Sequence, residues 1–296
     1  MYATFRSQPP PAREGYVPIK NAELFIREIG RGQPIIVIHG GPDFDHTYLL
    51  PDMDRLADSY RLIYYDQRGR GKSRGELRLE EISIEQTVDD LDEVRNYLGL
   101  EEVAILGHSW GGHVAMHYGL RYPDSMSHMI LMNTAPASYE DMLLVRQDRL
   151  ERTSVHAETL NAMKASAEYK AGDPNTVTEY YRILFSTTIR RPEQLQRLNL
   201  SWTQQDILRG RAVEDRFMEG LYWAEGFTIL PRLKQLHNRT LVIHGDYDWI
   251  PIPCAAHIAE AIPGARLVVL KDCGHFAYIE DMDNVRKVMA DFFAGV

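Results

Sequence analysis

The chain has 296 residues, of which 44% are hydrophobic and 25% are charged, and its formal net charge is −9. This composition is typical of a globular protein, and the negative charge argues against nucleic acid and anionic membranes as partners. No apolar run reaches the roughly 20 residues of a transmembrane helix, and the polar start at Met1–Arg13 does not resemble a secretory signal. The two cysteines, Cys254 and Cys273, are too few for a disulfide framework, so we expect a soluble cytoplasmic protein.

The chain up to Met132 alternates between predicted strands and predicted helices. Short β-branched runs such as Pro34–Ile38 are typical of strands that are buried on both faces of a parallel sheet. Ser83 is a suitable N-cap for the longest of these helices, and Gly99 is a suitable end for it. The expected strands are Tyr16–Lys20, Glu23–Ile29, Pro34–Ile38, Leu62–Tyr65, Val103–Leu106 and Met129–Met132, and the expected helices are Thr47–Asp58, Ile84–Leu98 and His113–Arg121.

From Asn133 to about Leu236 the alternation stops and only helical periodicities remain. The helices predicted here are Tyr139–Ala171, Thr176–Phe185, Pro192–Gln205 and Val213–Ala224. Alternation then resumes with a strand at Thr240–His244, a helix at Ile252–Ala261, a strand at Arg266–Leu270 and a helix at Met282–Phe293.

This order predicts an α/β fold in which a mostly parallel sheet is flanked by helices. We expect residues 1–132 and 237–296 to form the core, and residues 133–236 to form an inserted helical lid over the strand ends. An independent helical domain is the alternative, and the immediate return of the alternation argues against it.

A nucleophile elbow is the first chemical motif in the chain. Val103–Leu106 leads into Gly107-His108-Ser109-Trp110-Gly111 and a helix follows, which is the strand–turn–helix setting of the G-x-S-x-G motif. Glycines two residues from the serine allow the tight turn that exposes the Ser109 hydroxyl. The N–H of Trp110 then lies at a helix N-terminus, where it can stabilise an oxyanion.

An activated serine needs a base, and the base needs an acid that orients it. His275 is the best placed of the 11 histidines, because its loop follows the last predicted strand and contains a flexible glycine. The acid is expected at a strand end between Ser109 and His275, where Asp246 and Asp248 both follow the same strand. We choose Asp248, because Asp246 comes directly after a glycine and is better suited to an Asx-turn. Asp141 in the lid is a weaker alternative.

The loop His39-Gly40-Gly41-Pro42 supplies the other half of an oxyanion hole. Two successive glycines let the backbone approach a substrate closely, and the proline restricts the exit from the turn. The Gly41 N–H is the expected donor, together with the N–H of Trp110. The other histidines near these motifs are expected to have structural roles: His39, His108, His113 and His117.

No cofactor and no metal ion is predicted. His113 and His117 are four residues apart, but the glutamate of an H-E-x-x-H motif and a third ligand are missing. The glycine-rich segment Gly69–Ser73 lacks the spacing of a phosphate-binding loop. We expect a rigid turn there, in which Asp66 and Arg68 pair.

Together these motifs resemble the α/β-hydrolase fold superfamily, and within it the chain is similar to the proline iminopeptidases (prolyl aminopeptidases). The resemblance covers nearly the whole chain outside the lid. It rests on His39-Gly40-Gly41-Pro42, Tyr65-Asp66-Gln67-Arg68-Gly69-x-Gly71-x-Ser73, Gly107-x-Ser109-Trp110-Gly111-Gly112, and Asp248 with Gly274-His275. It implies a catalytic triad of Ser109, Asp248 and His275, with Gly41 and Trp110 as the oxyanion donors.

The resemblance also implies that lid carboxylates bind the free α-amino group of the substrate, and the candidates are Glu214 and Glu225, near Trp223. Two positions depart from the family pattern. Asp43 occupies a position where the family usually has glycine, and His108 one where it more often has a small residue.

The sequence therefore predicts a cofactor-free serine hydrolase that acts by acyl transfer on a short peptide or small amide with a free N-terminal residue such as proline. A carboxylesterase for small esters is the alternative. A ligand-binding protein that kept the fold and lost turnover is a third reading, and the complete triad argues against it. The sequence leaves the oligomeric state open.

Overall fold

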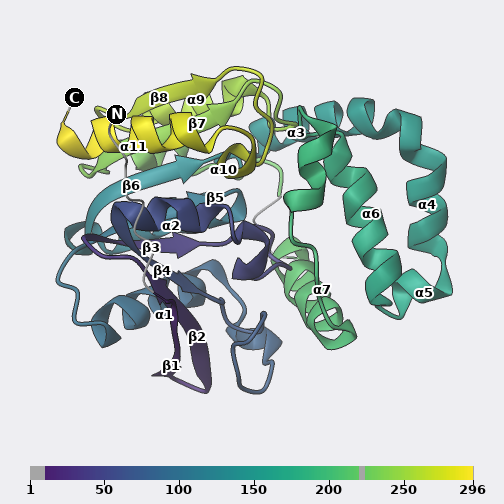
Figure 1. The fold of residues 1–296 in the computed structure, drawn as a ribbon, viewed down its shortest axis with the longest axis horizontal. Helices are drawn as coiled ribbons and strands as arrows, with labels where there is room; N and C mark the ends of the chain where they lie inside the picture. The colour runs from purple at the N-terminus through teal and green to yellow at the C-terminus, as the bar shows by residue number, and fades with distance from the viewer. Residues whose placement is uncertain (1–10, 220–223, 296) are drawn as a thin grey trace, which may run out of the picture.

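The computed structural model describes residues 11–219 and 224–295, and an eight-stranded sheet with the order β1-β2-β4-β3-β5-β6-β7-β8 runs through its centre (Figure 1). β2 is antiparallel to both β1 and β4, and the other neighbours are parallel. The strands are β1 (Arg13–Ile19), β2 (Ala22–Ile29), β3 (Gln33–Ile38), β4 (Tyr60–Tyr65), β5 (Val103–His108), β6 (Met126–Met132), β7 (Arg239–Gly245) and β8 (Arg266–Leu270). The predicted mostly parallel sheet is thus confirmed.

The central strands of the sheet are buried on both faces. Successive strand residues point to opposite sides, so each strand contributes side chains to both. In β3, Ile35 and Val37 belong to one apolar cluster, and Ile36 and Ile38 belong to the other. The second cluster includes residues of α1 (Ile84–Tyr97), α2 (Trp110–Arg121) and α9 (Ile252–Ala261), whereas the first includes residues of α10 (Ala277–Glu280) and α11 (Met282–Ala294). Helices therefore cover the sheet on both sides.

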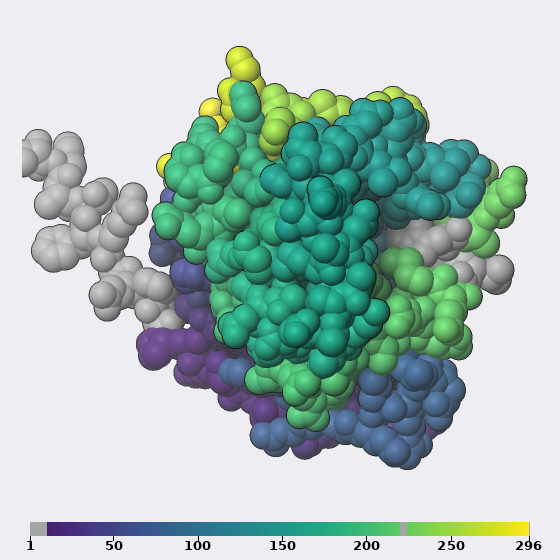
Figure 2. All heavy atoms as spheres, turned by 90° about the vertical axis from the view of Figure 1, so that its right-hand side faces the viewer, coloured from purple at the N-terminus to yellow at the C-terminus, as the bar shows by residue number. Residues whose placement is uncertain are grey.

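Among the described residues, the regular elements between β6 and β7 are all helices, apart from one isolated bridge, Ser138 to Thr228. Its helices are α3 (Tyr139–Thr153), α4 (Ala157–Ala165), α5 (Ala167–Lys170), α6 (Pro174–Ser186), α7 (Gln204–Glu219) and α8 (Leu230–Leu233). Helices α3 to α7 gather at one end of the sheet (Figure 1). Seen from that end, their teal and green segments cover the middle of the molecule (Figure 2). The division at residues 133 and 236 stays a prediction.

Three predicted helices were wrong in detail. Tyr139–Ala171 is divided into α3, α4 and α5. Thr47–Asp58 is not one helix, because Pro51 has no N–H to donate and disfavours the helical conformation at Leu50, whose ψ is 151°. Pro192–Gln205 is not one helix, because residues 198–203 are irregular and bury Leu198 and Leu200, two residues apart. The short 3₁₀ helices are η1 (His46–Leu49), η2 (Met53–Asp58), η3 (Leu79–Glu81), η4 (Pro123–Ser125), η5 (Ser154–His156) and η6 (Pro192–Arg197).

Helix α7 begins at Gln204, earlier than the predicted Val213. The predicted end of that helix at Ala224 is separated from α7 by residues outside the described ones. No helix in the described ranges has the length and apolarity that crossing a membrane requires.

Candidate active site

Ser109 lies at the sharp turn between β5 and α2, as the elbow motif predicts. Its φ of 54° and ψ of −119° are unusual for a residue with a side chain, and such backbone strain costs on the order of 1–3 kcal/mol. A Cβ on Gly107 would lie 2.3 Å from the carbonyl oxygen of Gly111, so the turn closes only because glycine is present. The strand and the helix on either side of the turn hold the strained serine in place.

The three residues of the predicted triad meet although they are far apart in the sequence. Nε2 of His275 lies 3.1 Å from Oγ of Ser109, and Nδ1 of His275 lies 2.9 and 3.0 Å from the two carboxylate oxygens of Asp248. Ser109 follows β5, Asp248 follows β7 and His275 follows β8. Carboxyl ends of parallel strands share one edge of a sheet, which explains why the three side chains converge.

The carboxylate of Asp248 is buried and charged. Burial raises its pKa, but the charge and hydrogen bond of His275 outweigh burial, and the pKa falls to about 2. The Ile250 N–H donates to Oδ1 at 3.0 Å, and Nδ2 of Asn133 donates to Oδ2 at 2.9 Å. Asn133, at the end of β6, is therefore a donor to the acid, a role that the sequence did not reveal.

Thr188, just after α6, is a second residue that the sequence analysis missed. Its carbonyl oxygen accepts the N–H of His275 at 2.9 Å. Its hydroxyl accepts the N–H of Trp249 at 3.0 Å and lies 3.4 Å from Oδ1 of Asp248. One residue between β6 and β7 thus contacts both the histidine loop and the aspartate loop.

The loop after β3 approaches Ser109 closely. A Cβ on Gly40 would lie only 2.9 Å from Cβ of Ser109, so a side chain there would separate this loop from the serine. Gly41 follows with a φ of 53°, and Trp110 is the first residue of α2. The two predicted oxyanion donors therefore belong to segments that lie directly next to Ser109.

His108, which precedes the nucleophile, is buried and neutral. Burial and the nearby His275 lower its pKa to about 3. Its Nε2 lies 2.9 Å from the carbonyl oxygen of His275, and its Nδ1 lies 2.6 Å from the Tyr48 hydroxyl. The predicted structural role for His108 agrees with these contacts, because every polar atom of its ring has a partner.

Two carboxyl groups interact near the candidate active site: that of Asp43, in the loop after β3, and that of Glu214, in α7. The hydroxyl of Tyr181 in α6 donates to Oδ2 of Asp43 at 2.5 Å. A Cβ on Gly210 of α7 would lie 2.4 Å from the carbonyl oxygen of Asp43, so α7 packs directly on this residue. The negative charge of Asp43, together with burial, raises the pKa of Glu214 to about 8. Asp43 and Glu214 therefore compete for protons when no cation lies between them.

The second predicted lid carboxylate, Glu225, is exposed on a turn, whereas Glu214 is partly buried on α7. Trp223, which the prediction placed next to it, lies outside the described residues. Glu214 is the candidate whose pKa the charge of Asp43 raises.

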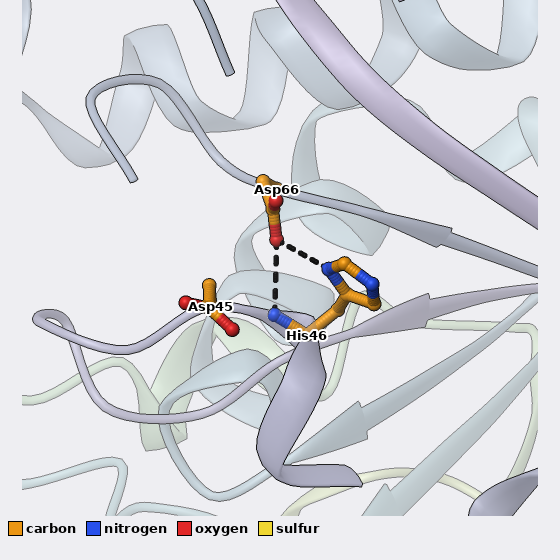
Figure 3. A group of neighbouring side chains, drawn as sticks. All are labelled: Asp45, His46 and Asp66. Carbon is orange, nitrogen blue, oxygen red and sulfur yellow. Dashed lines mark hydrogen bonds and ion pairs between the residues drawn. The ribbon is translucent and has the colours of Figure 1, made fainter. Parts of the chain in front are cut away.

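Asp45, His46 and Asp66 are close enough to one another to hold a metal ion (Figure 3). However, Oδ1 of Asp66 already accepts the backbone N–H of His46 at 2.9 Å and lies 2.7 Å from its Nδ1. Oδ2 of Asp66 accepts the N–H of Lys72 at 2.9 Å. These bonds explain the cluster as a brace between the loop after β4 and η1.

The predicted pairing of Asp66 with Arg68 was wrong. Nε and Nη2 of Arg68 instead donate to the two carboxylate oxygens of Asp90 at 2.9 and 2.8 Å, and its Nη1 donates to Glu81 at 2.9 Å. Asp90 lies on the inner face of α1, which the sequence pattern could not place opposite Arg68.

The family model of the alpha/beta hydrolase fold matches residues 33–282. The chain is similar to the proline iminopeptidase of Clostridioides difficile, with 27% identity over 293 residues, 94% of this chain and 97% of that protein. It is similar to the proline iminopeptidase of Saccharolobus solfataricus, with 27% identity over 298 residues, 94% of this chain and 91% of that protein.

Two solved structures share the fold. The proline iminopeptidase of Mycobacterium smegmatis has a TM-score of 0.71 at 22% identity, covering 96% of this chain and 98% of that chain. A thermophilic esterase from Thermogutta terrifontis has a TM-score of 0.68 at 23% identity, with coverage of 96% and 98%. The chain therefore belongs to the α/β-hydrolase fold family, as its motifs implied, and it is a hydrolase.

Proposed function

We propose that the protein is a serine hydrolase that forms an acyl-enzyme on Ser109, and that it removes an N-terminal residue such as proline from short peptides or amides. The observation that carries the proposal is the hydrogen-bonded line from Ser109 through His275 to the buried carboxylate of Asp248. A serine becomes nucleophilic when an oriented imidazole takes its proton, and this geometry provides that orientation.

In the first half of the reaction, Nε2 of His275 takes the proton of Oγ while Oγ of Ser109 attacks the carbonyl carbon. Asp248 holds the imidazole through Nδ1–H and stabilises its positive charge. The N–H groups of Gly41 and Trp110 donate to the oxygen of the tetrahedral intermediate, and each such donor contributes roughly 10²–10³-fold in rate. His275 then gives its Nε2 proton to the leaving nitrogen, and the bond between carbon and nitrogen breaks.

In the second half, His275 takes a proton from water, and the resulting hydroxide attacks the ester carbon of the acyl-enzyme. The same two N–H groups stabilise the second oxyanion. The proton then returns from His275 to Oγ of Ser109, and the free acid leaves. No net proton remains on the protein, so the site is ready for another cycle.

The position of Glu214 supports a substrate with a free amine. In α7, Glu214 is one turn after Gly210, which packs on Asp43, and three residues before Phe217, whose ring lies 4.7 Å from that of Trp110. This face of α7 therefore spans the segments of both proposed oxyanion donors. The α-amino group of an aminopeptidase substrate is attached to the carbon next to the attacked carbonyl, so a carboxylate is needed near this position. A bound ammonium group would replace the proton for which Asp43 and Glu214 compete.

A carboxylesterase for small esters is the alternative function, and the fold is compatible with it, since the esterase from Thermogutta terrifontis shares that fold. The acidic pair distinguishes the two proposals, because a neutral ester has no cation for Asp43 and Glu214 to bind. We therefore favour the aminopeptidase.

The test compares proline arylamide, its N-acetylated form and a short p-nitrophenyl ester. We expect the free amine to be cleaved, N-acetylation to abolish cleavage, and Ser109→Ala to lower kcat by roughly 10⁴-fold or more. Rapid ester turnover without arylamide cleavage would establish the esterase instead. Unchanged activity of purified Ser109→Ala would exclude the serine as nucleophile.

A second comparison tests the amine contact. Glu214→Gln is expected to raise KM for proline arylamide about tenfold, because a charged hydrogen-bond partner contributes about 1.5 kcal/mol. Glu219→Gln, an exposed position on the same helix, is the matched control and is expected to keep the wild-type KM. Equal effects of the two variants would exclude Glu214 from amine binding.

A further inference from the structure

Arg149 lies near the C-terminal end of α3, and its guanidinium lies over the indole ring of Trp249. The guanidinium carbon is 5.3 Å from the centre of that ring. The Trp249 ring is in turn 5.4 Å from the imidazole ring of His275. The three side chains therefore form a row that begins at the proposed base and ends at a positive charge.

The guanidinium of Arg149 is held over the Trp249 ring and not in a salt bridge. Among the described residues no carboxylate pairs with it, and its side chain is exposed. One turn later, Arg152 differs: it pairs with Asp148 and donates to the carbonyl oxygens of Tyr247 and Asp248. A guanidinium that lies over an aromatic ring uses its face for that contact. Its N–H groups stay available for a planar anion.

The charge of Arg149 acts on the same region as the acidic pair. It lowers the pKa of Asp43 and that of Glu214, in both cases against the effect of burial. The neighbouring cation Lys164 also lowers the pKa of Glu214. The region around Ser109 thus has carboxyl groups on α7 and the loop after β3, and a guanidinium on α3.

The direction of proton transfer indicates which part of the substrate lies near Arg149. His275 must deliver the Nε2 proton to the leaving nitrogen, so the leaving residue lies on the His275 side of the scissile bond. The Trp249 ring borders the His275 ring, and the Arg149 guanidinium lies over Trp249. We propose that Arg149 binds the C-terminal carboxylate of the leaving peptide, so that the preferred substrates are short zwitterionic peptides. This inference rests on the proposed aminopeptidase function.

The distances limit the length of such a substrate. Two ring contacts of 5.4 and 5.3 Å separate the imidazole from the guanidinium, and one extended residue spans about 3.3–3.6 Å. One to three residues after the scissile bond therefore bring a carboxylate to Arg149. Dipeptides to tetrapeptides fit, and a long peptide would carry its carboxylate past the guanidinium.

The experiment measures kcat/KM for prolyl-alanine and for the same dipeptide with a C-terminal amide. The two differ only at the C-terminal group, so a change of their ratio in an Arg149 variant isolates the contribution of carboxylate binding. We expect the wild-type protein to prefer the acid by about twofold to fivefold at low salt, the range of an exposed ion pair. The preference should shrink as sodium chloride is raised, because salt screens exposed charges.

Arg149→Gln is expected to bring the ratio of acid to amide close to one. Arg146→Gln is the matched control, because Arg146 is an exposed arginine on the same helix, and it should keep the wild-type ratio. Thermal unfolding of each variant checks that both are folded.

The outcomes separate the two proposals. If the wild-type protein cleaves acid and amide equally, or if Arg149→Gln keeps the preference, the carboxylate site is refuted while the aminopeptidase function stands. If the wild-type protein cleaves neither peptide nor proline arylamide, the aminopeptidase function fails, and the carboxylate site fails with it.

Discussion

The hydroxyl of Tyr48 and Nδ1 of His108 are 2.6 Å apart, and this contact joins the loop after β3 to the residue before Ser109. The N–H of Gly40 donates to the same hydroxyl at 2.7 Å. The carbonyl oxygen of His275 can only accept, so Nε2 of the neutral His108 ring carries the proton and donates it there. Nδ1 of His108 is then an acceptor, and the Tyr48 hydroxyl donates to it. One buried histidine thus connects three loops of the proposed active site.

Tyr48→Phe is expected to lower activity more than its effect on stability explains. It leaves the Gly40 N–H and Nδ1 of His108 without their partner, which costs about 1–3 kcal/mol in unfolding free energy. It also loosens the loop that carries Gly41, so we expect kcat to fall about tenfold. The control is Tyr278→Phe, because that buried hydroxyl donates to the Tyr48 carbonyl oxygen. Equal losses of kcat in the two variants would contradict a special role for Tyr48.

Thr188→Val is expected to reduce kcat about tenfold, because valine keeps the shape and loses the hydroxyl that contacts Trp249 and Asp248. Without this donor the Asp248 carboxylate attracts the imidazolium proton more strongly. The acid limb of the pH profile of kcat/KM should therefore move to higher pH. Thr188→Ser keeps the hydroxyl, so we expect it to keep the wild-type kcat and the wild-type pH profile. A loss of folded protein without a shift of the pH profile would assign Thr188 a structural role only.

Glu214 is expected to make the protein less stable as the pH rises. Its pKa in the folded protein, about 8, lies above its ordinary value of 4.5. Between these pH values the folded state binds more protons than the unfolded state, so the unfolding free energy falls with rising pH. Glu214→Gln removes this effect. The Tm of the variant minus that of the wild type should therefore increase from pH 4.5 to pH 8. Asp43→Asn should likewise weaken the fall of the unfolding free energy with pH, because the Asp43 charge is the main cause of the raised pKa of Glu214. A Tm difference that is constant with pH would contradict the coupling.

Arg68→Met is expected to destabilise the protein by about 3–5 kcal/mol, because it leaves the Asp90 carboxylate buried without its cation. Urea unfolding measures this loss. The double variant Arg68→Met with Asp90→Asn should recover part of it, since the uncompensated charge is then gone. Additive losses in the double variant would show that the pair is not coupled.

Most of the core could be predicted from local patterns. Buried strands such as β3 and β5 are continuous β-branched or aliphatic runs, and α9 was predicted with its bounds. Ser109, Asp248 and His275 were proposed because each follows a predicted strand, and strand ends of a parallel sheet meet. The helical segment between β6 and β7 was harder, because the periodicity did not show where extended residues such as Leu198 and Leu200 interrupt it.

The residues that the sequence analysis missed have no local signature. Thr188 and Asn133 are ordinary residues in their segments, and Arg68 was paired with the wrong aspartate because Asp90 lies 22 residues further along. Such contacts depend on how the segment between β6 and β7 docks on the core and on how α1 packs against the sheet.

The sequence by itself determined the order of strands and helices, the elbow around Ser109 and the residue types needed for acyl transfer. It did so because local sterics and hydrophobic periodicity act over a few residues. Only the tertiary structure decided that Tyr48 connects Gly40 to His108, that Thr188 contacts two loops of the proposed active site, and that Asp43, Glu214 and Arg149 share one region. Those relationships depend on distances between segments that are remote in the chain, which are set by packing and not by neighbouring residues.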